Sequence, residues 1–142
     1  MTDPEVIAKT QAYVDPLFGE GAGAKHVRFL DGIQNDALRE QGHRYHAVEA
    51  NTQHLSLQEN YLIGMCVLCA GKHYGTAAMF AKTLLHLGTP KDKLLEAVGR
   101  LSMWIGGLPA VEASFVIQKA IREYERDGSA ALAAWFPEEP RP

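Results

Sequence analysis

The residues best suited to chemistry lie in the short stretch from Cys66 to Thr76. Cys66 and Cys69 stand three positions apart, and His73 follows four positions later. Two thiols at this spacing can pass electrons as a dithiol and a disulfide, and a histidine one helical turn further on can carry the proton. The cysteines also end a strongly apolar stretch, where burial and the helix dipole both disfavour a thiolate. We therefore expect them to be buried packing residues, with a redox pair as the alternative.

A second candidate is the break in the helical pattern at Gly71, directly after the cysteines. A helix that begins there presents free backbone N–H groups and the positive end of its dipole to an approaching anion. Lys72 adds a positive charge, and His73 is the natural acid or base at neutral pH. His73 also shares a helical stripe with Ala77 and Leu84. The alternative is therefore a core histidine that bonds a backbone carbonyl.

A third candidate is a histidine-rich segment further upstream. His43, His46 and Glu49 follow one another at steps of three, which keeps them on one broad side of a helix, and His54 lies beyond. Two histidines and a carboxylate are ligands that a metal such as zinc accepts. The alternative is a solvated helix face, since Arg39, Glu40 and Arg44 lie in the same segment. We favour the solvated face and assign no metal.

These groups would be positioned by an all-α chain of about six helices. Asp3 and Pro4 are typical of a helix start, Ser56 is a plausible N-cap, and three glycines between 19 and 23 suggest a flexible link. Apolar residues at helical spacing complete the pattern, and no segment resembles a strand. The expected helices run from Pro4 to about Pro16, Gln34 to Asn51, Leu57 to Ala70, about Gly71 to Leu87, Pro90 to Ile105, and Pro109 to about Gly128.

Composition excludes several classes of protein. The 142 residues carry a net charge of −3, so no basic surplus attracts nucleic acid. The longest uncharged apolar run, Tyr61–Ala70, is about half the roughly twenty residues that a membrane-spanning helix needs. The first residues lack the basic and apolar regions of a signal peptide. We expect a soluble, cytoplasmic protein that binds neither nucleic acid nor a membrane.

The segment between residues 55 and 124 resembles the carboxymuconolactone decarboxylase family, whose fold is shared with the alkylhydroperoxidase D proteins. A leucine-rich charged start, an apolar helix, a glycine stop and a glycine–proline junction follow in order. These features are carried by Leu55–Glu59, Leu62–Ile63, Leu85–Gly88, Leu94–Ala97 and Gly106–Ala110. The resemblance implies a single all-α domain over 1–142, with a core at about 33–127. It also implies a homo-oligomer of three or six chains. The polar, proline-rich residues at 137–142 predict a flexible tail.

The register of the resemblance bears on the cysteines. Peroxidase-type members of the family carry a glutamate, two cysteines and a histidine at fixed spacing. Anchored on Gly88 and Pro109, those positions are occupied by Tyr61, His73, Thr76 and Phe80. None of the four matches, so the resemblance supports the family's fold without its peroxidase site. Upstream, Glu49 falls on a glutamate of the family.

The resemblance and the residues together predict a cofactor-independent lyase or isomerase that acts on a small carboxylated lactone or enone. His73 and Glu49 would be the catalytic residues, and Lys72, Tyr74 and Trp104 would bind the substrate. Two other functions stay open. One is a thiol peroxidase or disulfide reductase that uses Cys66, Cys69 and His73. The other is a non-catalytic oligomeric binding protein.

Overall fold

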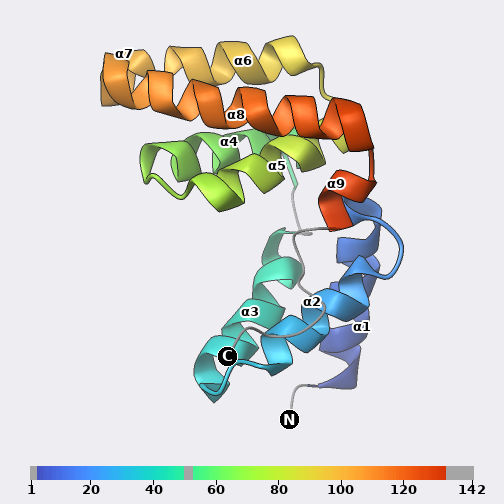
Figure 1. Cartoon of the computed structure of the whole chain (residues 1–142). Helices are drawn as coiled ribbons and strands as arrows, with labels where there is room; N and C mark the ends of the chain where they lie inside the picture. Colours follow the sequence, from blue (N-terminus) through green and yellow to red (C-terminus); the bar gives the residue numbers. More distant parts are fainter. Residues whose placement is uncertain (1–2, 50–52, 134–142) are drawn as a thin grey trace. The chain divides into compact units, whose positions relative to one another are not determined.

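The computed structural model describes residues 3–49 and 53–133, and the side chains of 3–45 and 53–132. Its described residues are helical and contain no strand, which confirms the all-α prediction (Figure 1). They divide into two compact units, the described residues up to 54 with residue 133, and residues 55–132. We name them unit 1 and unit 2. The single domain expected over 1–142 stays a prediction, and the expected tail at 137–142 lies outside the described residues.

Unit 1 is built from three helices that pack against one another: α1 (Pro4–Phe18), α2 (Ala22–Asp31) and α3 (Asp36–Glu49). The first begins as predicted, because the Asp3 carboxylate accepts a hydrogen bond from the backbone N–H of Glu5 and proline occupies the first turn. The core of unit 1 includes buried side chains from both α1 and α2, among them Val14, Leu17, Val27 and Leu30.

The helix α2 is not predicted by the sequence pattern, which indicates a flexible link around its start. Gly19 and Gly21 do form a turn with positive φ angles of 99° and 80°. Gly23 has a different role, since a Cβ atom there would lie 2.6 Å from the Cα atom of Gln11 on α1. It lets the two helices approach closely, and its N–H donates to the Asp15 carboxylate at 2.7 Å. This glycine therefore serves packing within a helix rather than chain flexibility.

Unit 2 contains α4 (Leu57–Ala70), α5 (Tyr74–His86), α6 (Lys91–Arg100), α7 (Ser102–Ile105) and α8 (Gly107–Asp127), with α9 (Ala130–Ala133) at its end. Helix α8 packs against both α5 and α6, and α4 packs against α5. More helices are therefore present than the six expected, partly because the segment 90–105 divides into α6 and α7. Fully buried side chains from four helices make the core: Met65, Leu84, Leu94 and Ile117.

The start of α4 follows the prediction closely. The Ser56 hydroxyl accepts a hydrogen bond from the Glu59 backbone N–H, and the Glu59 carboxylate accepts one from the Ser56 N–H, which is a complete capping box. One turn further on, a Cβ atom on Gly64 would lie 2.6 Å from the ring of Phe80. The bare glycine lets α5 lie against α4, and Phe80 then packs on Tyr61 with 4.7 Å between the ring centres.

One end of unit 2 gathers the elements that carry the candidate residues. The turn from α4 to α5, the short helix α7 and the start of α8 lie together there, on the left in Figure 1.

Within residues 3–49 and 53–133, none of the helices has the length and apolar character needed to cross a bilayer.

Candidate functional site

The turn between α4 and α5 holds Lys72 in a conformation that side chains rarely adopt. The His73 N–H donates to the Leu68 carbonyl at 2.8 Å, and the Lys72 N–H donates to the Cys69 carbonyl at 3.1 Å. This is the Schellman pattern of helix ends, in which the residue at the position of Lys72 is usually glycine. Lys72 has φ = 60°, and it is the one residue other than glycine with a positive φ among the described residues. A left-handed conformation costs an L-residue about 1–2 kcal/mol.

Helix α5 begins directly after this strained residue, and its first turn has no side-chain cap. His73 is the N-cap residue, and its carbonyl accepts the first hydrogen bond of the helix, from Ala77. The N–H groups of Tyr74, Gly75 and Thr76 precede that bond, so they have no partner within the helix. Lys72 and His73 are both exposed. An anion at this turn would therefore meet backbone N–H groups, a lysine and an imidazole.

The helical spacing of His73 predicts that its imidazole begins an apolar face of α5. In the structure it does not, because the ring is exposed. It lies over Gly71, where an added Cβ atom would sit 3.0 Å from the imidazole Cδ2 atom and 3.5 Å from Nε2. The alternative expected from the sequence, a core histidine, is wrong because the ring is exposed. Gly71 therefore affects the ring's position as well as ending α4.

A carboxylate that the sequence did not indicate lies beside Tyr74. The Tyr74 hydroxyl donates a hydrogen bond to Glu112 Oε2 of α8 at 3.2 Å. Partial burial and this hydrogen bond raise the pKa of Tyr74, so its hydroxyl keeps its proton at neutral pH. The two residues are 38 positions apart in the chain. No local pattern marks Glu112, since the contact arises only from the packing of α8 on α5.

The two cysteines are free thiols on α4, with Cys69 buried and Cys66 half-buried. Burial raises the pKa of Cys66, and burial together with the neighbouring Cys66 raises the pKa of Cys69 to about 11. Burial of Cys69 confirms the prediction for that residue. Both thiols are protonated near neutral pH, which disfavours attack on a disulfide or a peroxide.

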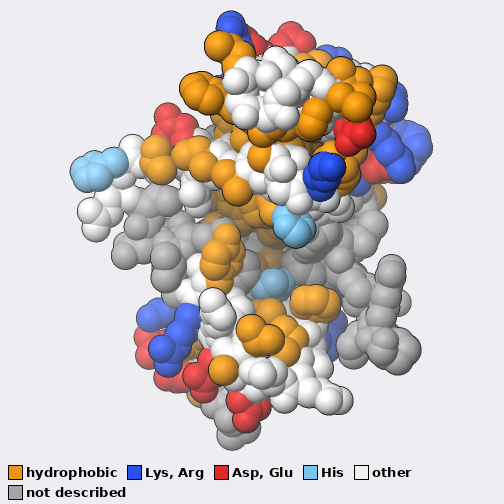
Figure 2. Space-filling view, turned by 90° about the vertical axis from the view of Figure 1, so that its left-hand side faces the viewer, with side chains coloured by type: hydrophobic (Ala, Val, Ile, Leu, Met, Phe, Trp, Pro, Cys, Tyr) orange, Lys and Arg blue, Asp and Glu red, His pale blue; other side chains and the backbone are white. Residues whose placement is uncertain are grey.

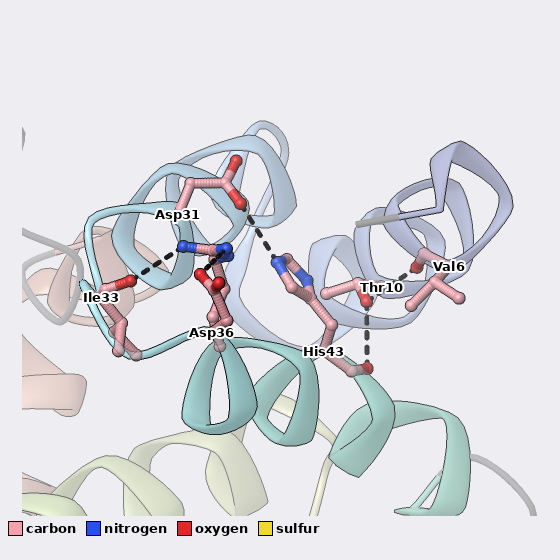
Figure 3. Close-up of polar contacts among 7 residues, drawn as sticks. Val6, Thr10, Asp31, Ile33, Asp36 and His43 are labelled. Atoms are coloured by element: carbon pink, nitrogen blue, oxygen red, sulfur yellow. Dashed lines mark hydrogen bonds and ion pairs between the residues drawn. The ribbon is translucent and has the colours of Figure 1, made fainter. Parts of the chain in front are cut away.

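The histidine-rich segment is positioned differently from the solvated face that we favoured. His43 is fully buried, and its Nε2 atom lies 3.3 Å from Asp31 Oδ1 of α2 (Figure 3). Its carbonyl oxygen accepts a hydrogen bond from the Thr10 hydroxyl of α1 at 3.4 Å. The prediction of a solvated face is wrong for His43 because the helix turns this residue toward α1 and α2, although Glu40 and Arg44 are exposed.

The remaining predicted ligands and the second catalytic residue are only partly described. The side chains of His46 and Glu49 lie outside the described residues, and His54 is exposed. Among the described side chains, His, Cys, Asp and Glu form no group of three that could hold a metal ion. Glu49 belongs to unit 1 and His73 to unit 2, so the pairing of these two residues stays a prediction.

Trp104 does not lie in an enclosed pocket wall, because 81% of its surface is exposed on α7. Met103 and Leu108, its neighbours at the same end of unit 2, are also mostly exposed. Figure 2 looks onto this end and shows hydrophobic side chains gathered on unit 2. The residues near the α4–α5 turn therefore border an apolar surface.

Comparison of the chain with protein-family models, curated proteins and solved structures gives no significant match.

Proposed function

We propose that the chain is a cofactor-independent lyase or isomerase of the carboxymuconolactone decarboxylase type, with its chemistry at the turn between α4 and α5. The observation that carries the proposal is the conformation of Lys72, which is held at φ = 60° directly before an uncapped helix start. Strained residues persist where the surrounding structure enforces them, and they cluster at functional sites. Here the hydrogen bonds of the turn hold Lys72 in the strained conformation, directly before His73.

The site suits a small carboxylated substrate that becomes an enolate-like anion. Negative charge would be held by the first N–H groups of α5 and by the Lys72 ammonium group. Tyr74 would bind the substrate through its ring at the same helix start, because the single proton of its hydroxyl is already donated to Glu112. Each of these donors gains strength as the charge develops on the substrate oxygen, which is the requirement for catalysis rather than simple binding.

His73 would supply the proton. When the substrate carboxylate leaves as CO₂, its bonding electron pair stays on the substrate as the enolate. The carbon then takes a proton from the His73 imidazolium, and the neutral imidazole regains a proton from water. Glu49 stays the proposed second acid or base, and Glu112 is a positioning residue that holds the Tyr74 hydroxyl.

The family's fold and assembly are part of the same proposal. The ordered features between Leu55 and Tyr124 support an alkylhydroperoxidase D-like helical domain, and unit 2 contains the whole of that segment. Helix α4 keeps exposed apolar residues, Ile63 and Val67, which supports association into a homo-oligomer of three or six chains. The raised pKa values of both thiols count against the peroxidase or reductase alternative.

The test is turnover of a panel of small carboxylated lactones and enones. Turnover is measured as CO₂ release and as the change in substrate absorbance. His73→Ala should lower kcat by about 10²–10⁴-fold, because it removes the proton donor. His54→Ala is the matched control, since His54 is exposed and has no role in the proposed chemistry. Equal turnover in the two variants would place the chemistry elsewhere, and binding without turnover by the unmodified chain would favour the binding-protein alternative.

A further inference from the structure

Helix α8 carries a row of large apolar side chains on its outer side. Leu108, Val111 and Phe115 are 72%, 49% and 65% exposed. Steps of three and four residues keep the three side chains on one side of a helix. The opposite side of α8 is buried against its own unit through Ala113, Ile117 and Ala120. The outer row therefore faces away from the buried side of α8.

A glutamate and a lysine lie on either side of Phe115 along the helix, at similar distances from it. Glu112 precedes Phe115 by three residues and Lys119 follows it by four, which places the carboxylate about 4.5 Å and the ammonium stem about 6 Å along the axis from Phe115. Both flanking residues fall on the same edge of the row. Lys119 is 73% exposed, and its ion pair with Glu123 is a loose one of 3.8 Å.

We propose that two copies of the chain associate through α8 in antiparallel orientation, with Phe115 near the two-fold axis. Such an axis places Glu112 of each copy opposite Lys119 of the other, because the two residues are nearly equidistant from Phe115. The row then forms an apolar centre with a charged rim, as in stable protein interfaces. A second copy is the occupant because this one helix supplies both halves of two reciprocal ion pairs, as an isologous contact requires.

The contact also bears on the proposed site, and this part of the inference rests on the proposed function. Glu112 accepts the hydrogen bond from Tyr74, so the second copy's ammonium group would lie beside the carboxylate that positions the Tyr74 hydroxyl. Each copy would then support the other's site. A ring of three chains has no two-fold axis, so the contact fits a dimer or an assembly of six.

The experiment is sedimentation velocity of the full chain from about 1 to about 100 µM, a range that spans moderate dimer affinities. The unmodified chain should show a species that contains an even number of 15.6 kDa chains. Phe115→Asp should weaken the association at least about 100-fold, since it puts two carboxylates at the centre of the contact. Circular dichroism checks that each variant keeps its helical content.

Charge exchange gives the sharper test. Glu112→Lys and Lys119→Glu should each weaken the association about tenfold, because like charges then face one another at both rims. The double variant E112K/K119E restores both pairs and should recover the original affinity to within about threefold. Leu38→Asp on α3 is the matched control, with an apolar side chain that is 56% exposed and has no part in the proposed contact.

Three results would overturn the proposal. They are a monomer throughout the concentration range, a failure of the double variant to recover, and loss of association in Leu38→Asp with Phe115→Asp unaffected. The last result would place the contact on α3. Because mass is the readout, failure here is distinguishable from failure of the proposed function, which is measured by turnover.

Discussion

The deciding quantity at Cys66 and Cys69 is the pKa of each thiol. Because the pKa of Cys69 is raised to about 11 and that of Cys66 is also raised, the reactive thiolate forms only in alkaline solution. We expect alkylation by iodoacetamide to be slow at pH 7 and to accelerate as the pH approaches the raised values. The denatured chain is the control, and both of its thiols should react at the rate of an ordinary cysteine. Rapid alkylation of the native chain at pH 7 would restore the redox alternative.

At the same scale, local pattern predicts some residues and misses others for a physical reason. The capping residues Asp3 and Ser56 are predictable because a cap bonds within three positions of itself. Glu112 and His43 are not, since their partners Tyr74 and Asp31 are brought to them by the packing of separate helices. Lys72 was indicated for its charge, but its positive φ follows from the turn's hydrogen bonds and not from its own preference.

The packing of one element on another is tested by a pair that joins α5 to α8. The ammonium group of Lys82, which is buried, lies 2.5 Å from a Glu123 carboxylate oxygen. The hydrogen bond from Lys82 lowers the pKa of Glu123, so the pair stabilises the fold above the ordinary glutamate pKa and that contribution is lost as the pH falls toward and through the lowered value. Glu123→Gln should lower the free energy of unfolding at pH 7 by about 2 kcal/mol.

The control is Glu125→Gln, which breaks the pair with Lys91 on α6. Both side chains of that pair are about half exposed, at 53% and 51%, so its loss should cost less than about 0.5 kcal/mol. Chemical denaturation at pH 7 and at pH 3 measures both variants. A Glu123→Gln effect as small as that of the control, or one that persists undiminished at pH 3, would contradict the expectation.

Helix bounds show the same division between local and long-range causes. The bounds of α4 follow from apolar spacing and the Ser56 cap, so the sequence pattern predicts them well. The pattern places the start of α8 two residues late, because that start has no side-chain cap, and it places the end correctly at Gly128. The pattern misses α2 because Gly23 signals a loop locally while serving a close contact with α1. The division of 90–105 into α6 and α7 has no marker at Leu101, which keeps right-handed helical angles of φ = −59° and ψ = −23°.

For the whole molecule, the two compact units lead to a prediction about independent folding. Unit 2 buries Met65, Leu84, Leu94 and Ile117 completely, and its helices pack on one another. We expect a fragment of residues 55–132 to be helical and to unfold cooperatively in far-ultraviolet circular dichroism. The same fragment with Leu84→Asp is the control and should be unfolded, because it buries a charge in that core. A gradual melt in the unmodified fragment would show that unit 2 requires the rest of the chain.

The left-handed conformation of Lys72 in the α4–α5 turn lowers the stability of the fold, but the residue supplies a positive charge at the start of α5. A redesign that sought only a firmer scaffold would choose Lys72→Gly, since glycine relieves roughly 1 kcal/mol of backbone strain there. The same exchange removes the ammonium group beside the start of α5. Any collection of variants ranked by thermal resistance alone would therefore be enriched in chains that have lost this cation, and ranking for both properties should retain the lysine and gain stability elsewhere.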